Sequence, residues 1–201
     1  MVRRRPDRYG TVCRKFPFVW FSDPAAARDY RLQAIRSYTT LAPPARDFPL
    51  ARFTSRTDPA TRAVGYDKGM MVFHMLRNIV GEGNFYRMLK DMLVEKKFQR
   101  VSWEDFGKES EKVSHKDLGW FFTQWLDEKG VPDINVEDLS LRLNGDKFEV
   151  SFTLVQKSHA YKLGLPVTVT YLSGGGDTET LALEKEKQSF SLFFDRMPAT
   201  M

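Results

Sequence analysis

The sequence lacks the features that mark a secreted or membrane-spanning chain. It has one cysteine, Cys13, so no disulfide can form within the chain and nothing indicates an oxidising compartment. No apolar run approaches the roughly 20 residues that a spanning helix needs. The stretch at residues 16–21 is interrupted by Pro17 and is too short for a signal-peptide core of about 7–15 apolar residues. We therefore expect no membrane partner and, by default, a cytoplasmic chain.

Histidine is also scarce, and common catalytic motifs are missing. No two of the three histidines, His74, His115 and His159, are four residues apart, so the HExxH pattern that places two ligands on one helix face does not occur. There is no Gly-x-Ser-x-Gly, no phosphate loop and no dinucleotide fingerprint. We predict no metal ligand and no cofactor-binding residue in this chain.

The charge is concentrated at one end. The formal net charge is +5, and residues 1–20 alone carry that excess, so the remaining residues sum to zero. A basic arm of this kind can bind phosphates without specificity, but it is more typical of a solvated terminus. We do not expect nucleic acid as a partner. Binding by residues 1–15 is kept as a third reading, which predicts affinity that falls steeply with salt and disappears when the arm is deleted.

Helical signals fill the middle of the chain. Asp23-Pro24 is typical of a helix start, and the pattern predicts a helix over residues 24–39 followed by a long loop over 42–63. A mostly buried helix is expected from residues 63–66 to Gly81, and a third over 84–97. Ser102 and Ser114, each followed three residues later by aspartate, predict two further capped helices, the last ending at Gly130.

After Pro132 the apolar period changes to two. Leu139, Leu141 and Leu143 alternate with polar residues up to Asn144-Gly145, a strong hairpin signal. Four more alternating segments follow, so we predict five strands in a small antiparallel β-sandwich that lacks an edge strand. The fold class is α+β in separate units. The expected domains are an irregular basic arm at 1–22, a helical subdomain at 23–131 and a β-sandwich at 132–201.

Three local motifs in this order resemble the gluzincin aminopeptidases, the membrane alanyl aminopeptidase family. Tyr66-Asp67-Lys68-Gly69 before an apolar helix is similar to the family's Tyr-Glu-Lys-Gly. The segment at residues 81–85 is similar to its Gly-Asp-Glu-x-Phe, and residues 121–132 to its Phe-Phe-x-x-Trp…Gly-x-Pro ending. The resemblance covers about residues 25–195 and implies the end of a catalytic domain joined to a β domain.

By this resemblance, Tyr66 is the candidate catalytic residue. In the family, the tyrosine at its position donates its hydroxyl to the oxyanion that forms when zinc-bound water attacks the peptide carbonyl. From the pattern alone, the simpler reading of Tyr66 is a helix-start tyrosine that packs its ring and hydrogen-bonds a loop, and the resemblance is what brings the catalytic reading level with it. Lys68 is either a group that orients a nearby carboxylate or, more simply, a structural lysine at a helix end. His74 fits a core histidine better than a metal ligand.

The zinc ligands and the exopeptidase glutamate motif of that family are absent from this sequence. Catalytic zinc needs three protein ligands, and the chain does not offer them in the family's arrangement. The leading hypothesis is therefore a fragment of a zinc aminopeptidase-like protein, which supplies Tyr66 and is inactive alone. Loss of the missing half would expose helix faces, through which we expect a homo-oligomer or a partner. The rival hypothesis is a non-catalytic module that binds a protein or peptide.

Overall fold

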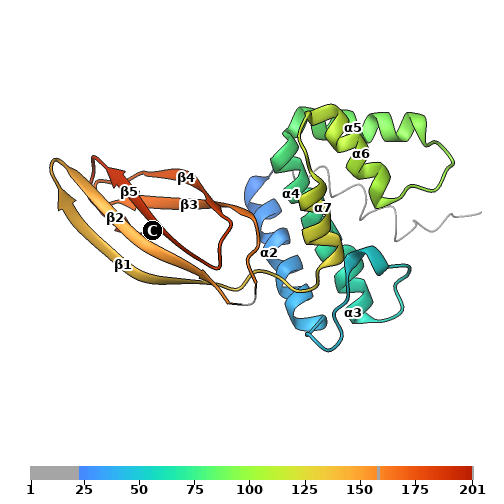
Figure 1. Ribbon diagram of the computed structural model, residues 1–201, viewed down its shortest axis with the longest axis horizontal. Helices are drawn as coiled ribbons and strands as arrows, with labels where there is room; N and C mark the ends of the chain where they lie inside the picture. Colours follow the sequence, from blue (N-terminus) through green and yellow to red (C-terminus); the bar gives the residue numbers. More distant parts are fainter. Residues whose placement is uncertain (1–22, 158, 201) are drawn as a thin grey trace, which may run out of the picture. The chain divides into compact units, whose positions relative to one another are not determined.

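The chain divides into two compact units, Met1–Gly130 and Val131–Met201, each described by itself. The computed structural model describes residues 23–157 and 159–200. The basic arm expected at residues 1–22, and the phosphate binding considered for it, lie outside this range. One unit is helical and the other consists of antiparallel strands (Figure 1), so the predicted α+β class is confirmed. Within the described ranges, no helix combines the length and apolar character that crossing a bilayer requires.

The helical unit opens with α2 (Pro24–Leu41), close to its predicted bounds. Asp23 caps it by accepting a hydrogen bond from the backbone N–H of Ala26 at 3.0 Å. The loop expected over residues 42–63 contains two short helices, η1 (Leu50–Arg52) and α3 (Pro59–Arg62), so that prediction is wrong in part. The reason for α3 is local, because Asp58 and Thr61 form a capping box.

The remaining helices run from Ala63 to Asp127. Two of them, η2 and η3, are short π-helices, whose wider turn occurs frequently at functional sites. The bounds are η2 (Ala63–Lys68), α4 (Gly69–Val80), α5 (Glu82–Glu95), α6 (Trp103–Ser114), α7 (Gly119–Phe122) and η3 (Thr123–Asp127). In Figure 1, α4 lies at the centre of the unit, in contact with both α2 and α5.

One predicted helix start is confirmed and the other is wrong. Ser102 caps α6, and its hydroxyl and the carboxylate of Asp105 form the expected capping box. Ser114 instead ends α6, with its hydroxyl donating to the carbonyl of Ser110 at 2.6 Å. His115 follows with φ 55°, in the left-handed region that closes a helix. The next helix therefore begins only at Gly119.

The helical core is made by apolar side chains of η1, η2, α4, α5 and α7. Val72 and Leu76 on α4 are completely buried, and Val80 is 4% exposed. Leu50, Val64, Met88, Leu118 and Phe121 join them at 0–1% exposure. Because Val64 lies on η2 and is part of this closely packed core, the core holds η2 in position.

The β unit contains two three-stranded antiparallel sheets, with strand orders β1-β2-β5 and β4-β3-β6. The five predicted strands are present, and the prediction missed β6, a strand too short to show a period. The bounds are β1 (Ile134–Asn144), β2 (Lys147–Gln156), β3 (Leu163–Tyr171), β4 (Gly176–Leu183), β5 (Lys187–Phe194) and β6 (Pro198–Thr200). Side chains of β2, β3, β4 and β5 form its core.

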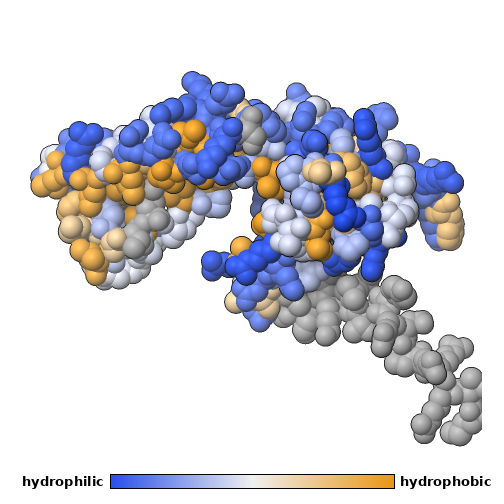
Figure 2. All heavy atoms as spheres, turned by 90° about the horizontal axis from the view of Figure 1, so that it is seen from below, coloured by the Kyte–Doolittle hydropathy of each residue, from blue (hydrophilic) through white to orange (hydrophobic). Residues whose placement is uncertain are grey.

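Strand β1 leaves two inward-facing leucines uncovered. Leu141 pairs with Val150 and Leu143 with Phe148, so these leucines share the face that β2 buries. Val150 is 4% exposed, whereas Leu141 and Leu143 are 45% and 67% exposed. Figure 2 looks at the β unit from the side on which Figure 1 places β1, and hydrophobic side chains form a band there. The core covers β2, β5 and Ile134 at the start of β1, but it does not cover these two leucines.

Candidate functional site

Tyr66 stands on the π-turn η2 with 58% of its surface exposed. Its ring packs edge-on against Phe53, with ring centroids 5.9 Å apart and planes at 81°. Gly65 makes this packing possible, because a Cβ at that position would overlap the ring of Phe53. The hydroxyl of Tyr66 makes no hydrogen bond with any residue that the structure describes. A phenol held at its ring with its hydroxyl in solvent is available to a ligand.

Asp67, the next residue, is buried and accepts two hydrogen bonds at Oδ2. It is 8% exposed and accepts hydrogen bonds from the hydroxyl of Ser37 at 2.6 Å and from Arg62 Nη1 at 3.1 Å. Ser37 lies on α2 and Arg62 ends α3, so one carboxylate joins both helices to the turn that carries Tyr66. Charge-assisted bonds of this kind are the stronger ones in proteins.

Lys68 anchors the other end of the turn. It is 5% exposed, and its Nζ donates to the backbone carbonyl of Glu128 at 2.8 Å. Burial lowers the pKa of Lys68 from its ordinary 10.5, and the nearby carboxylates of Asp47 and Glu128 oppose that shift. The side chain thus meets a carbonyl oxygen just after η3, which favours the structural reading of Lys68 over that of a carboxylate-orienting group.

A second network lies beside Lys68 and holds the same chain end. The hydroxyl of Tyr38 donates to Asp47 Oδ2 at 2.7 Å, and the backbone N–H of Gly130 donates to the same oxygen at 2.6 Å. Lys68 Nζ lies 5.8 Å from the ring centre of Tyr38. The turn that carries Tyr66 is therefore surrounded by residues from several elements: α2, the loop after it, η2 itself and the end of η3.

Sequence reasoning missed these supporting residues. Ser37 and Asp67 are separated by 30 positions, and Lys68 and Glu128 by 60. No sequence motif predicts which of these residues contact one another, because the contacts form only in the tertiary fold. The one available signal was composition, because an aspartate and a lysine directly before a buried apolar helix need partners.

The three histidines lie on different elements and do not form one site. His74 is on α4, where burial, with Arg31 and Arg77 nearby, lowers its pKa from 6.5 to about 4. His115 follows α6, and the ring of His159 packs on Tyr161 with centroids 4.0 Å apart. Among residues 23–157 and 159–200, no three His, Cys, Asp or Glu side chains are grouped to hold a metal. The described residues do not fit zinc.

Comparison with known proteins agrees with the motif resemblance. Residues 51–125, which include the Tyr66 turn, match the peptidase family M1 domain. "Probable aminopeptidase 1" of Sulfurisphaera tokodaii is 31% identical over 136 residues, 66% of this chain and 16% of that protein. "Aminopeptidase M1-C" of Oryza sativa subsp. japonica is 29% identical over 101 residues, 49% of this chain and 12% of that protein.

A solved structure supports the fold. Legionella pneumophila aminopeptidase A, solved in complex with aspartic acid, has a TM-score of 0.54 and 20% sequence identity, and the match covers 74% of this chain and 18% of that one. The chain therefore spans less than a fifth of the proteins to which it is similar. It is similar to a segment of the M1 aminopeptidases, and this part of the resemblance is confirmed.

Proposed function

We propose that this chain is the tyrosine-bearing segment of a zinc aminopeptidase-like protein, with Tyr66 as the oxyanion donor. The observation that carries the proposal is the geometry of η2. Tyr66 is exposed and its hydroxyl has no partner among the described residues, while Asp67 and Lys68 beside it are buried and bonded.

In the proposed role the phenol acts only as a hydrogen-bond donor. The oxygen of the scissile peptide carbonyl gains negative charge as water adds to its carbon, and the hydroxyl of Tyr66 donates to that oxygen. The donor stabilises this charge more than the neutral carbonyl, so it lowers the barrier. In the intact family zinc activates the attacking water; the described residues do not supply its ligands, so we propose that the chain alone does not hydrolyse peptides.

The test places this segment in a complete relative. Residues 24–130 replace the matching segment of the Sulfurisphaera tokodaii protein, and the chimera is assayed on aminoacyl-anilides with and without Tyr66→Phe. We expect Tyr66→Phe to lower kcat by about 10²–10³ with little change in KM. Tyr86→Phe, at a tyrosine 40% exposed on α5, is the matched control and leaves kcat unchanged. An active chimera in which Tyr66→Phe has full kcat would contradict the role.

A second candidate function is supported by the uncovered face of β1. Leu141 and Leu143 are 45% and 67% exposed on the inward side of a sheet, and Leu139, earlier on the same strand, is 60% exposed. Such a face favours binding of a protein or peptide, as the rival hypothesis supposes. Light scattering of the chain against concentration, compared with Leu141→Lys, tests whether this face joins copies of the chain. A monomer at all concentrations in both proteins would count against self-association there.

A further inference from the structure

The connection between α5 and α6 forms an exposed apolar tip. We call residues 90–101 the α5–α6 tip. Four apolar side chains stand out of it, with exposed fractions of 76% for Leu93, 70% for Val94, 97% for Phe98 and 43% for Val101. In Figure 1 the connection between α5 and α6 lies at the end of the helix pair, and in Figure 2 hydrophobic and hydrophilic side chains adjoin at that end. Aromatic and aliphatic groups this exposed mark an interaction surface.

The tip is held firmly at its base and strained at its apex. Lys96 Nζ lies 2.9 Å from Asp105 Oδ1, and the N–H of Gln99 donates to the carbonyl of Lys96 at 2.9 Å. Phe98 has φ 63°, a left-handed conformation that favours glycine or asparagine. Folding therefore holds an aromatic ring in solvent on a strained backbone, and neither burial nor packing of the ring compensates. Such outliers are typical of functional segments.

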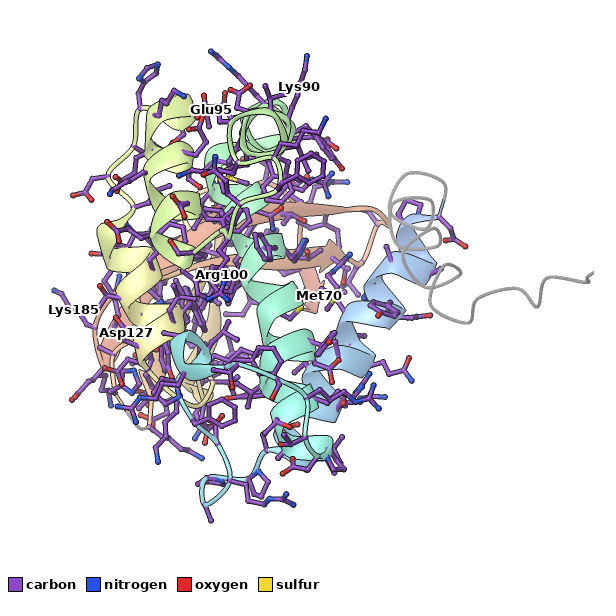
Figure 3. All side chains as sticks on the ribbon, turned by 90° about the vertical axis from the view of Figure 1, so that its right-hand side faces the viewer. Met70, Lys90, Glu95, Arg100, Asp127 and Lys185 are labelled. Carbon is purple, nitrogen blue, oxygen red and sulfur yellow. The ribbon has the colours of Figure 1, made fainter. Side chains whose placement is uncertain are left out.

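The charged side chains of the tip that lie outside ion pairs are all positive. Every carboxylate at the tip and in the first turn of α6 lies in an ion pair, although Lys112 is shared between Glu95 and Glu109. The pairs are Arg87–Asp91, Lys112–Glu95, Lys108–Glu104 and Lys96–Asp105. By contrast, Lys90, Lys97 and Arg100 form no ion pair with a described residue. Lys97 Nζ lies 5.2 Å from the ring centre of Phe98, and in Figure 3 Lys90 extends outward from this helix pair.

Two kinds of partner combine apolar and anionic groups, an acidic peptide and an anionic bilayer surface, and the shape of the tip favours one of them. An acidic peptide is normally received in a groove, which surrounds its side chains. Phe98 is 97% exposed at the apex of a turn, so it projects into a partner rather than enclosing one. Apolar side chains that project beside cations fit the interface of a bilayer, where the rings enter the acyl boundary and the cations meet phosphate.

We propose that the α5–α6 tip is a peripheral docking site for anionic phospholipid surfaces. Phe98, Val94 and Leu93 enter the interface, and Lys90, Lys97 and Arg100 contact the headgroups. The sequence led us to expect no membrane partner because it has no long apolar run. Peripheral binding needs no such run, since a turn assembles the apolar side chains in space. The proposal is independent of the aminopeptidase role proposed for Tyr66.

The test is binding of the full chain to vesicles of phosphatidylcholine with about 30% phosphatidylserine, measured by co-sedimentation. Phe98→Gly is the central variant, because glycine accepts φ 63° without strain and the fold should be unharmed or stabilised. We expect Phe98→Gly to lower the partition constant about tenfold, and Lys97→Gln about fivefold. Leu172→Ser, at a leucine of the β unit that is 67% exposed and lies outside the β1 face, is the matched control and leaves binding unchanged.

Two outcomes would overturn the proposal. Residues 1–20 carry a net charge of +5, so the chain can adsorb to anionic vesicles through them. Because Phe98→Gly conserves charge, binding that Phe98→Gly leaves unchanged would show that the arm alone is responsible. Absence of binding to these vesicles at low salt would also exclude the site. A fluorophore on Val94→Cys, in a Cys13→Ser background, should shift to the blue on binding, whereas one on Leu172→Cys should not.

Discussion

The ammonium of Lys68 donates a hydrogen bond to the backbone carbonyl of Glu128 over 2.8 Å, although 60 positions separate the two residues. Both are at ends of π-helical turns, Lys68 at the last residue of η2 and Glu128 just beyond η3. The bond holds the end of the helical unit against the turn that carries Tyr66. The geometry of Tyr66 therefore depends on a contact between two motifs that are far apart in the sequence.

Replacing Lys68 by methionine should destabilise the helical unit. Methionine fills a similar volume in the buried position of Lys68 but removes the donor of this partly buried, charge-assisted hydrogen bond, which costs about 1–3 kcal/mol. Chemical denaturation monitored by tryptophan fluorescence measures the loss, and Lys90→Met on the surface of α5 is the control with no measurable effect.

The cost of Lys68→Met should also grow at alkaline pH. Burial lowers the pKa of Lys68 below 10.5, so in this range the unfolded chain binds more protons than the folded one. The free energy of unfolding of the wild type therefore rises with pH between the lowered pKa and 10.5, and that of Lys68→Met lacks this contribution. A difference between the two proteins that stays constant from pH 7 to about 10.5 would contradict the assignment.

Asp67→Asn should be more harmful than loss of an ordinary ion pair. Asp67 bonds Ser37 and Arg62 inside the protein, and removing its charge leaves a partly buried guanidinium without its counter-charge. We expect a loss of about 2–4 kcal/mol in the free energy of unfolding. Asp91→Asn breaks the exposed pair with Arg87, whose closest atoms are 3.8 Å apart, and should cost at most about 0.5 kcal/mol. Equal losses in the two variants would show that Asp67 has no special structural role.

The contrast between Ser102 and Ser114 shows what local sequence can predict. Both are followed three residues later by aspartate, yet only Ser102 starts a helix. Ser114 is still inside α6, because the apolar stripe through Val113 continues the helix to that point. A capping pattern therefore predicts a helix start only where the preceding residues do not themselves form a helix with a buried face.

The Tyr66 region was predictable in part, for a related reason. The motif and the apolar stripe after it indicated the turn and a buried helix, and Leu76 and Val80 of that stripe are buried. The π-helical geometry and the partners of Asp67 and Lys68 were not predictable, because they depend on α2 and η3, which are distant in sequence. Similarly, the period of β1 predicted a strand but did not reveal that the second sheet leaves its leucines uncovered.

Gly65→Ala should disturb the packing of Tyr66 without changing its chemistry. The added Cβ would overlap the ring of Phe53, which supports Tyr66 edge-on. Overpacking of this kind costs about 1–3 kcal/mol. Because Phe53→Leu makes room for the methyl group, the double variant should be more stable than the sum of the single changes implies. Thermal unfolding of the wild type, the two single variants and the double variant gives the coupling free energy between positions 65 and 53. Strictly additive effects would exclude a direct clash.

His74 should make the helical unit less stable in acid. Burial, with Arg31 and Arg77 nearby, lowers its pKa from 6.5 to about 4, so the imidazole is neutral in the folded protein at pH 7. Between pH 6.5 and about 4, the unfolded chain binds more protons than the folded one, and the free energy of unfolding falls as the pH is lowered through this range. Denaturation curves from pH 7 to about 4 should therefore show a steeper decline in the wild type than in His74→Gln, whose amide does not titrate. The matched control is His115→Gln at the end of α6, which should keep the full decline. If His74→Gln declined as steeply as the wild type, other groups would account for the acid sensitivity, and His74 would not be held neutral by its surroundings.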